Sequence, residues 1–441
     1  MARRRTVPHP VTRRDRILRG LLALVYLLPL SGLIVWEYRD HLMRPSNICE
    51  GVDAEPRSAL YSALYARMLD WTHNDISTPV SIVAIPADLE EIQANYCLGR
   101  EYLADVLTAI TTQHPAEIVI DKFYSPAACA ASPASTQKLS NAMQSVGVPV
   151  IVGLNTDLAA KKRDGACLIA RPTVDFAASN VRYGDLRLDE DVERIPFQWT
   201  VLPADSESAK PEFHDTLSLA AIKAYDNDFI RRARIQKLID AHVHPYARLD
   251  TELPRQTTTD ILCSVGTPAM RQRWTPDCSR PAPGLSLLGR IVVIGAEQDV
   301  DRHMVMGAPM WGFDTQARYI ADMLSGSYLH ALPRWIFLPL FALFVLVIEG
   351  LPTLFEVYRP HWKTHPLFTH AFTRRRYVWV IFWTIAFILG LTVLCILLRY
   401  LPPLALFGDI CFIVITRLLF FLAESAEAPL VHHPTKGHSN A

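Results

Sequence analysis

Four long apolar runs constrain this 441-residue chain most. They occupy residues 20–36, 334–354, 377–398 and 403–422, and each is about as long as a helix needs to be to cross the hydrocarbon core of a bilayer. The intervening residues 37–333 have the composition of a water-soluble domain. We therefore expect four transmembrane helices and one large domain outside the bilayer.

Basic residues indicate the orientation, because they gather on the cytoplasmic side of a membrane. Residues 1–19 and 355–376 are rich in arginine, which predicts a cytoplasmic basic tail and a cytoplasmic basic loop. The domain at 37–333 is then periplasmic, and 423–441 form a cytoplasmic tail. This arrangement is that of a multi-pass protein of the bacterial inner membrane. The first run could instead be a secretory signal, but no small-x-small cleavage site follows it, so we expect an uncleaved anchor.

The formal net charge is zero, with 44 basic and 44 acidic residues. The basic segments are therefore local, and they favour contact with anionic membrane lipid. No nucleic-acid partner is expected.

Six of the eight cysteines fall in the predicted periplasmic domain, and the other two, Cys395 and Cys411, fall in predicted spans. An even number on the oxidising side of the membrane predicts disulfides, although free buried thiols are the alternative. The connectivity is open, but a Pro-rich loop between Cys263 and Cys278 favours that pair. The candidates are Cys49, Cys97, Cys129, Cys167, Cys263 and Cys278.

Apolar strands alternate with amphipathic helices along the domain, which predicts an α/β fold with a mainly parallel sheet flanked by helices. Alternation around the acidic run 189–191 predicts a β-hairpin between 181–186 and 192–197. The polar, Pro-rich residues 230–280 are expected to form a surface insertion. Strands are predicted at 79–85, 116–121, 148–154 and 291–295, and helices at 88–94, 101–112, 135–145, 217–224 and 315–325.

The order of these motifs resembles the type 2 CHASE domain, or CHASE2. The matching blocks include SIVAI, REYLADVLTAI, VIDKFYSP, VPVIVGL, RYGDLRLDEDVERIPF, LSLAAIKAY and GRIVVIGAEQDVDRHMV, and the span pattern extends the resemblance over roughly residues 37–422. The resemblance implies an extracytoplasmic sensory module of a bacterial signalling protein, with one span before the domain and three after it.

Two departures from the family pattern matter. Ile85 and Pro86 stand where the first strand of the family usually ends in an aspartate. Many relatives continue into a kinase or cyclase domain, whereas only a short segment follows Leu422 here. The resemblance therefore implies an output through a separate protein.

The best candidate ligand site lies where predicted strands end. Asp121 ends one strand and Asp301 closely follows another, and the carboxyl ends of parallel strands face the crevice where open α/β sheets bind ligands. With Lys122, Arg302 and His303 nearby, these carboxylates could hold a polar ligand or a cation. The alternative is that each carboxylate caps a helix or pairs with a basic neighbour.

No catalytic motif is present, so neither an enzyme nor a cofactor is expected. His242 and His244 have the H-x-H spacing of some metal sites, but a solvated loop is the better interpretation, and no metal site is predicted. The acidic run 189–191 is interpreted as a solvated turn, because it lacks the EF-hand spacing.

Two charged residues, Asp409 and Arg417, fall within the last predicted span. Charges within a bilayer tend to pair or to face other helices, so they could form a contact that relays a signal or recruits a partner. The favoured alternative is that both lie near the interfaces and orient the helix.

Together these features predict an inner-membrane sensor that binds an unknown periplasmic ligand or partner and signals to a separate cytoplasmic or membrane output protein. A second hypothesis is a structural or assembly subunit of a cell-envelope complex, in which the domain only docks. A weaker third hypothesis is an anchored periplasmic hydrolase. A homodimer is left open.

Overall fold

The computed structural model describes part of the chain, which divides into two compact units, Pro45–His330 and the remaining residues Met1–Arg44 with Ala331–Ala441. The described residues are 77–124, 129–130, 132–154, 162–163, 166–169, 176, 179–188, 194–203, 212–232, 235–240, 244–275, 278, 286–298, 301–305 and 308–331, with short stretches at 336, 339–340, 343, 382, 385–395 and 400–401.

Within these residues, no helix combines the length and apolar character that a membrane crossing requires. The predicted spans at 20–36 and 403–422 lie outside the described residues, and those at 334–354 and 377–398 are described only in part. In the second unit, residues 385–395 are helical and Tyr400–Leu401 form the short strand β14.

Six parallel strands form the main sheet of the first unit, in the order β6–β3–β2–β10–β1–β9. The last of these strands in the chain, β10, lies between β1 and β2. The strands are β1 (Val80–Ile85), β2 (Glu117–Ile120), β3 (Val150–Leu154), β6 (Val181–Asp185), β9 (Arg255–Thr257) and β10 (Ile291–Ala296).

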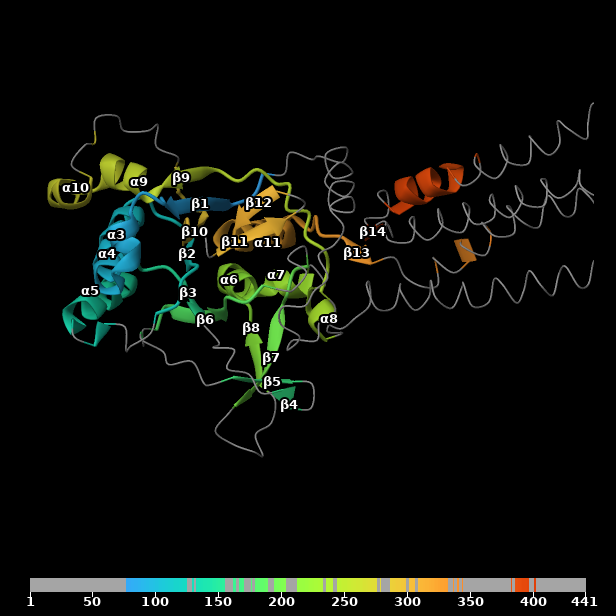
Figure 1. Cartoon of the computed structure of the whole chain (residues 1–441), viewed down its shortest axis with the longest axis horizontal. Coiled ribbons are helices and arrows are strands. Elements are labelled where there is room, and N and C mark those ends of the chain that lie inside the picture. Colours follow the sequence, from blue (N-terminus) through green and yellow to red (C-terminus); the bar gives the residue numbers. More distant parts are fainter. Residues whose placement is uncertain are drawn as a thin grey trace, which may run out of the picture. The chain divides into compact units, whose positions relative to one another are not determined.

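Helices cover both faces of this sheet (Figure 1). One face carries α3 (Glu90–Ala94), α4 (Tyr96–Thr111), α5 (Pro133–Ser145), α9 (Thr258–Val265) and α10 (Pro268–Trp274). The other face carries α6 (Leu217–Tyr225), α7 (Asn227–Arg232), α8 (Ile235–Asp240) and α11 (Gly312–Ser325).

Side chains that alternate along each strand build two separate cores. On β1, Ile82 and Ala84 pack toward α6 and α11, whereas Val83 and Ile85 pack toward α4 and α9. Because both faces of a parallel sheet are buried, its strands are apolar almost throughout. The predicted α/β fold with a mainly parallel sheet is therefore confirmed, and all four predicted strands and five predicted helices are present.

Local sequence explains where several helices begin. The side chain of Asn95 accepts hydrogen bonds from the first turn of α4, and Thr216 does the same for α6. Thr257 and Asp260 form a reciprocal capping box at the start of α9. Such caps satisfy backbone N–H groups that have no partner within the helix.

The domain contains an antiparallel hairpin, formed by β11 (Arg302–Val305) and β12 (Ala308–Trp311) rather than by the predicted segments. The hairpin predicted around 189–191 is wrong, because β6 pairs in parallel with β3 and Arg194 bridges to Tyr246. A separate four-stranded sheet holds β4 (Lys162–Arg163), β5 (Ala166–Ile169), β7 (Gln198–Pro203) and β8 (Glu212–Asp215). The short strand β13 (His330–Ala331) lies at the boundary of the two units.

The interpretation of residues 230–280 as a surface insertion is also wrong. This segment supplies β9, which pairs with β1 at one edge of the main sheet. It also supplies α9, whose Ile261 and Leu262 are fully buried in the core beneath α4. Only α10 has no buried residue among the described helices of this segment.

Candidate functional site

The carboxyl ends of β1, β10 and β2 meet at one edge of the main sheet. The helix that follows β1 lies on one face, and the helix that follows β10 lies on the opposite face. The strand order therefore reverses between these neighbours, and open α/β sheets bind ligands at such a point, outside the carboxyl ends of the strands. We call this region the carboxyl edge.

Asp121 and Asp301 both lie at the carboxyl edge. The backbone N–H of Asp121, just after β2, donates a 2.8 Å hydrogen bond to the carbonyl of Ile294 on β10. Burial and the negative charge of Asp301 raise the pKa of the Asp121 carboxyl well above its usual value. The two carboxylates therefore lie near enough to one another for the charge of Asp301 to affect Asp121.

Asp301 has a basic neighbour and a helix terminus beside it. Its Oδ1 lies 3.5 Å from Nε2 of His303, and both side chains are partly exposed. Its carboxylate also lies against Gly312, the first residue of α11, where any added β-carbon would collide with it. A negative charge is favourable at a helix N-terminus. The surroundings of Asp301 therefore fit the alternative interpretation, in which the carboxylate lies at a helix start or pairs with a basic neighbour.

Lys122 faces a different neighbour from Asp121. Burial, together with the positive charge of Arg100, lowers the pKa of the Lys122 ammonium. Arg100 is a buried residue of α4 whose Nη1 lies 2.5 Å from Oγ1 of Thr136 and whose guanidinium lies 5.5 Å from the ring centroid of Tyr124. No motif in the sequence indicates that a buried arginine would affect Lys122.

Arg302 lies apart from this pair. Its guanidinium is exposed and stacks over the ring of Trp311, 5.3 Å from the centroid, across the β11–β12 hairpin. The structure therefore separates the five predicted site residues. Asp121 and Asp301 lie together with His303 beside Asp301. Lys122 is affected by the unpredicted Arg100 instead, and Arg302 contacts Trp311 of its own hairpin.

A second charged cluster at the carboxyl edge was missed. Arg255 on β9 pairs with Glu297 at 2.5 Å and with Asp314 at 2.7 Å, and it lies over the ring of Phe313. Burial raises the pKa of the Asp314 carboxyl, although Arg255 opposes this effect. Glu297 directly follows β10, so the reasoning that selected Asp121 could have found it.

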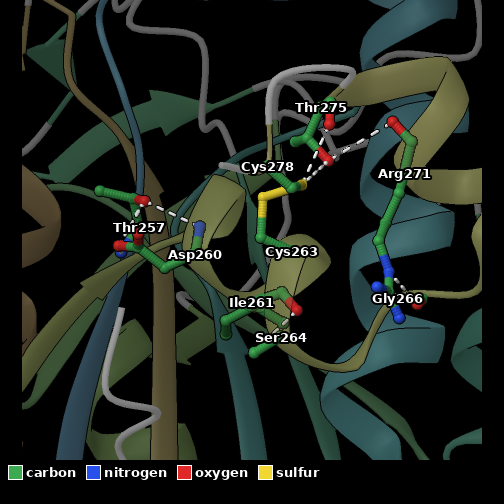
Figure 2. The surroundings of a disulfide bond; sticks show 9 residues. All are labelled: Thr257, Asp260, Ile261, Cys263, Ser264, Gly266, Arg271, Thr275 and Cys278. Atoms are coloured by element: carbon green, nitrogen blue, oxygen red, sulfur yellow. Dashed lines mark hydrogen bonds between the residues drawn. A yellow bond between two sulfur atoms is a disulfide. The ribbon is translucent and has the colours of Figure 1, made fainter. Parts of the chain in front are cut away.

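Two disulfides are present among the described residues. The predicted pair Cys263–Cys278 is confirmed, and it fastens α9 to the chain just after α10 (Figure 2). In that view the Cys278 sulfur lies beside Thr275, 3.0 Å from both its carbonyl and its hydroxyl oxygen. The second disulfide joins Cys97 in α4 to Cys129. Cys49 and the side chain of Cys167 lie outside the described residues.

The remaining predicted residues give no site in the described part of the chain. His244 packs edge-on against Phe197 and Trp199, while His242 and the acidic run 189–191 lie outside the described residues. Asp409 and Arg417 also lie outside them. Where side chains are described, no group of three His, Cys, Asp or Glu residues could hold a metal ion.

A family model described as the CHASE2 domain matches residues 50–351 of the chain. The matched range contains the whole main sheet, both layers of helices and the carboxyl edge. No curated protein and no solved structure matches the chain.

Proposed function

Because this chain belongs to the CHASE2 family of extracytoplasmic sensory domains, we propose that it is a sensor of the bacterial inner membrane. The observation that supports this proposal is the family match over residues 50–351, since CHASE2 domains typically occur in signalling proteins. In the proposed topology, the runs at 20–36, 334–354, 377–398 and 403–422 span the membrane and the α/β domain lies in the periplasm. The basic segments at 1–19 and 355–376 then contact anionic lipid.

The carboxyl edge is the proposed ligand site, and binding rather than catalysis is its proposed role. Its support is the position of Asp121, whose backbone bonds to the end of β10, and of Asp301, which lies against Gly312 at the start of α11. Isolated buried charge is costly, and a ligand that compensates this charge would bind one conformation of the domain better than another. A ligand shifts a conformational equilibrium only by this difference in affinity.

Helix α11 offers a direct route from this edge to the end of the domain. Its first residue, Gly312, contacts Asp301. Near its other end, Asp322 accepts backbone hydrogen bonds from Arg248 and Leu249 at 2.7 and 3.1 Å. Beyond α11, Leu329 exchanges two 2.8 Å backbone hydrogen bonds with Tyr246, close to the predicted second span. A displacement of α11 by a ligand would therefore be passed to the residues that enter the span.

A pull-down of the full chain from detergent-solubilised membranes tests this proposal. We expect recovery of a signalling protein as the separate output partner, and a signalling defect in the deletion strain. Recovery of envelope-assembly proteins without a signalling defect would instead favour the second hypothesis, a docking subunit, and would contradict the sensor role.

A further inference from the structure

One arginine at the carboxyl edge joins three elements of the fold. Arg255 is the first residue of β9, the strand at one end of the main sheet. Its Nη1 donates hydrogen bonds of 2.7 Å to both carboxylate oxygens of Asp314, in the first turn of α11. Its Nη2 donates a 2.5 Å hydrogen bond to Glu297, which directly follows β10. This single side chain therefore fastens β9 to the start of α11 and to the end of β10, and we call Arg255, Glu297 and Asp314 the latch.

Strand β9 is a weakly held part of the main sheet. It contains only three residues, all polar, and in that sheet it pairs with β1 alone. A short edge strand with few apolar contacts opens locally more readily than the central strands of a sheet. Release of the latch would therefore free β9 from α11, while β10 at the centre keeps both of its neighbours.

Two charged groups besides Arg255 act on the Asp314 carboxyl. Arg318 follows one helical turn later on α11, where side chains four positions apart are neighbours, and its positive charge favours ionisation of Asp314. Glu297 has the opposite effect. Arg318 is itself subject to the negative charges of Asp250 and Asp322, so its charge is shared among three carboxylates.

The other elements that pack against α11 direct their charges elsewhere. Strands β1, β10 and β12 contain no titratable residue. On α6, Lys223 pairs with Asp215 at 2.6 Å. Beside the start of α11, Asp301 lies 3.5 Å from His303, and Arg302 lies over an aromatic ring of its own hairpin. In the described part of the chain, the latch and Arg318 therefore dominate the surroundings of the Asp314 carboxyl.

The balance at Asp314 differs from that of most ion pairs. Burial outweighs the positive charges around it and raises the pKa of the Asp314 carboxyl above its usual value of 3.8. Because the folded pKa is the higher one, the stability contribution of this group is complete below pH 3.8 and is lost as the pH rises through the folded pKa. Acid that protonates Asp314 therefore ends its charge pairing with Arg255 without loss of stability from this group.

We propose that the latch is an acid-sensitive switch, which opens when a proton from the solvent binds the Asp314 carboxylate. The neutral carboxyl no longer holds the guanidinium by charge, Arg255 keeps its pair with Glu297, and the start of α11 separates from β9. This inference goes beyond the proposed ligand site, because its stimulus is the proton and it needs no ligand. Since α11 leads from the carboxyl edge to the end of the domain, its release acts on the same route as a bound ligand would.

Hydrogen–deuterium exchange of the full chain in lipid nanodiscs tests this inference over a pH series from neutral to mildly acid, with rates corrected for the intrinsic effect of pH. We expect corrected exchange of the β9 amides to become about tenfold faster or more as the pH falls, because a hydrogen bond to a charged group contributes a factor of this order. The midpoint should lie above pH 3.8. The amides of β10 are the internal control and should keep their rate.

Two isosteric variants separate the arms of the latch. Asp314→Asn imitates the protonated carboxyl, so at neutral pH it should show the fast β9 exchange of the acidified wild type, with no further change on acidification. Glu297→Gln removes a negative charge that raises the pKa of Asp314, so the midpoint should move to lower pH by roughly half a unit or more. Asp228→Asn, at an exposed position on α7, is the matched control and should change nothing.

Three results would overturn the inference: corrected β9 exchange that stays constant as the pH falls, β10 exchange that rises together with it, or slow β9 exchange in Asp314→Asn at neutral pH. If Asp314→Asn does not fold, the shift in Glu297→Gln decides, and a midpoint that stays in place or moves to higher pH would reject the latch. None of these results bears on the recovery of a signalling partner in the pull-down, so the sensor role stands or falls separately.

Discussion

Replacing Glu117 with glutamine should stabilise the domain at neutral pH. Glu117 is the first residue of β2 and its side chain is fully buried. Among the residues that the structure describes, neither of its carboxyl oxygens has a hydrogen-bond partner. Burial raises the pKa of this carboxyl from 4.5 to about 9, although the positive charge of Arg182 opposes the shift. The folded protein therefore holds a proton on Glu117 that the unfolded chain releases.

The magnitude follows from this difference in pKa. Because the folded pKa is the higher one, the stability contribution is complete below pH 4.5 and is lost as the pH rises from there toward 9. At pH 7 the loss is about 3 kcal/mol, since each unit of pKa difference corresponds to about 1.4 kcal/mol. Glutamine does not titrate, so Glu117→Gln should recover about 3 kcal/mol at pH 7 and almost nothing at pH 4.

Differential scanning fluorimetry of the full chain in nanodiscs, at pH 4, 5.5, 7 and 8.5, measures this effect. For a domain of this size, about 3 kcal/mol corresponds to a rise in Tm of roughly 6–12 °C at pH 7. The matched control is Glu91→Gln, at an exposed position on α3, for which we expect a change within about 0.5 kcal/mol.

The difference between variant and wild type isolates Glu117 from other titrating groups, because distant sites contribute additively. A variant that is no more stable than wild type at pH 7, or a gain that is the same at every pH, would refute the reasoning.

Three further substitutions test other parts of the fold. Asp322→Ala should lower stability by roughly 2–5 kcal/mol in chemical denaturation, because it leaves the buried N–H groups of Arg248 and Leu249 without their acceptor; an unchanged midpoint would contradict this. The double replacement Cys263→Ser, Cys278→Ser should cost about 3 kcal/mol, as expected for opening a 15-residue loop. A reductant should therefore lower the Tm of the wild type by more than it lowers the Tm of this variant. Gly295→Ala should cost about 1–3 kcal/mol by thermal denaturation, because its β-carbon would collide with Phe313 of α11, and a neutral result would show that α11 can move away from β10.

Elements with strong periodicity could be predicted from the sequence. Apart from Ser81, the strand Val80–Ile85 is apolar because both of its faces are buried, and α11 presents an apolar face to the sheet. The location of Asp121 and Asp301 near strand ends also followed from the sequence, because a parallel sheet gathers its carboxyl ends at one edge.

Pairings that depend on tertiary contacts could not be predicted. Strand β9 has only the three polar residues Arg255–Thr257, and it joins the sheet because β1 offers it a free edge. The alternation in β6 suggested a local hairpin, but its partner β3 lies far away in the sequence. Arg100 gave no signal either, because its role depends on Thr136 and Tyr124, which only the fold brings to it.

The location of the α/β domain outside the cytoplasm is the claim on which the sensor role depends, and reporter fusions test it most directly. Alkaline phosphatase and green fluorescent protein would each be fused after Ser206, with matched fusions after Lys363 in the predicted cytoplasmic loop. We predict phosphatase activity without fluorescence at Ser206 and the reverse at Lys363. Fluorescence without phosphatase activity at Ser206 would contradict the account.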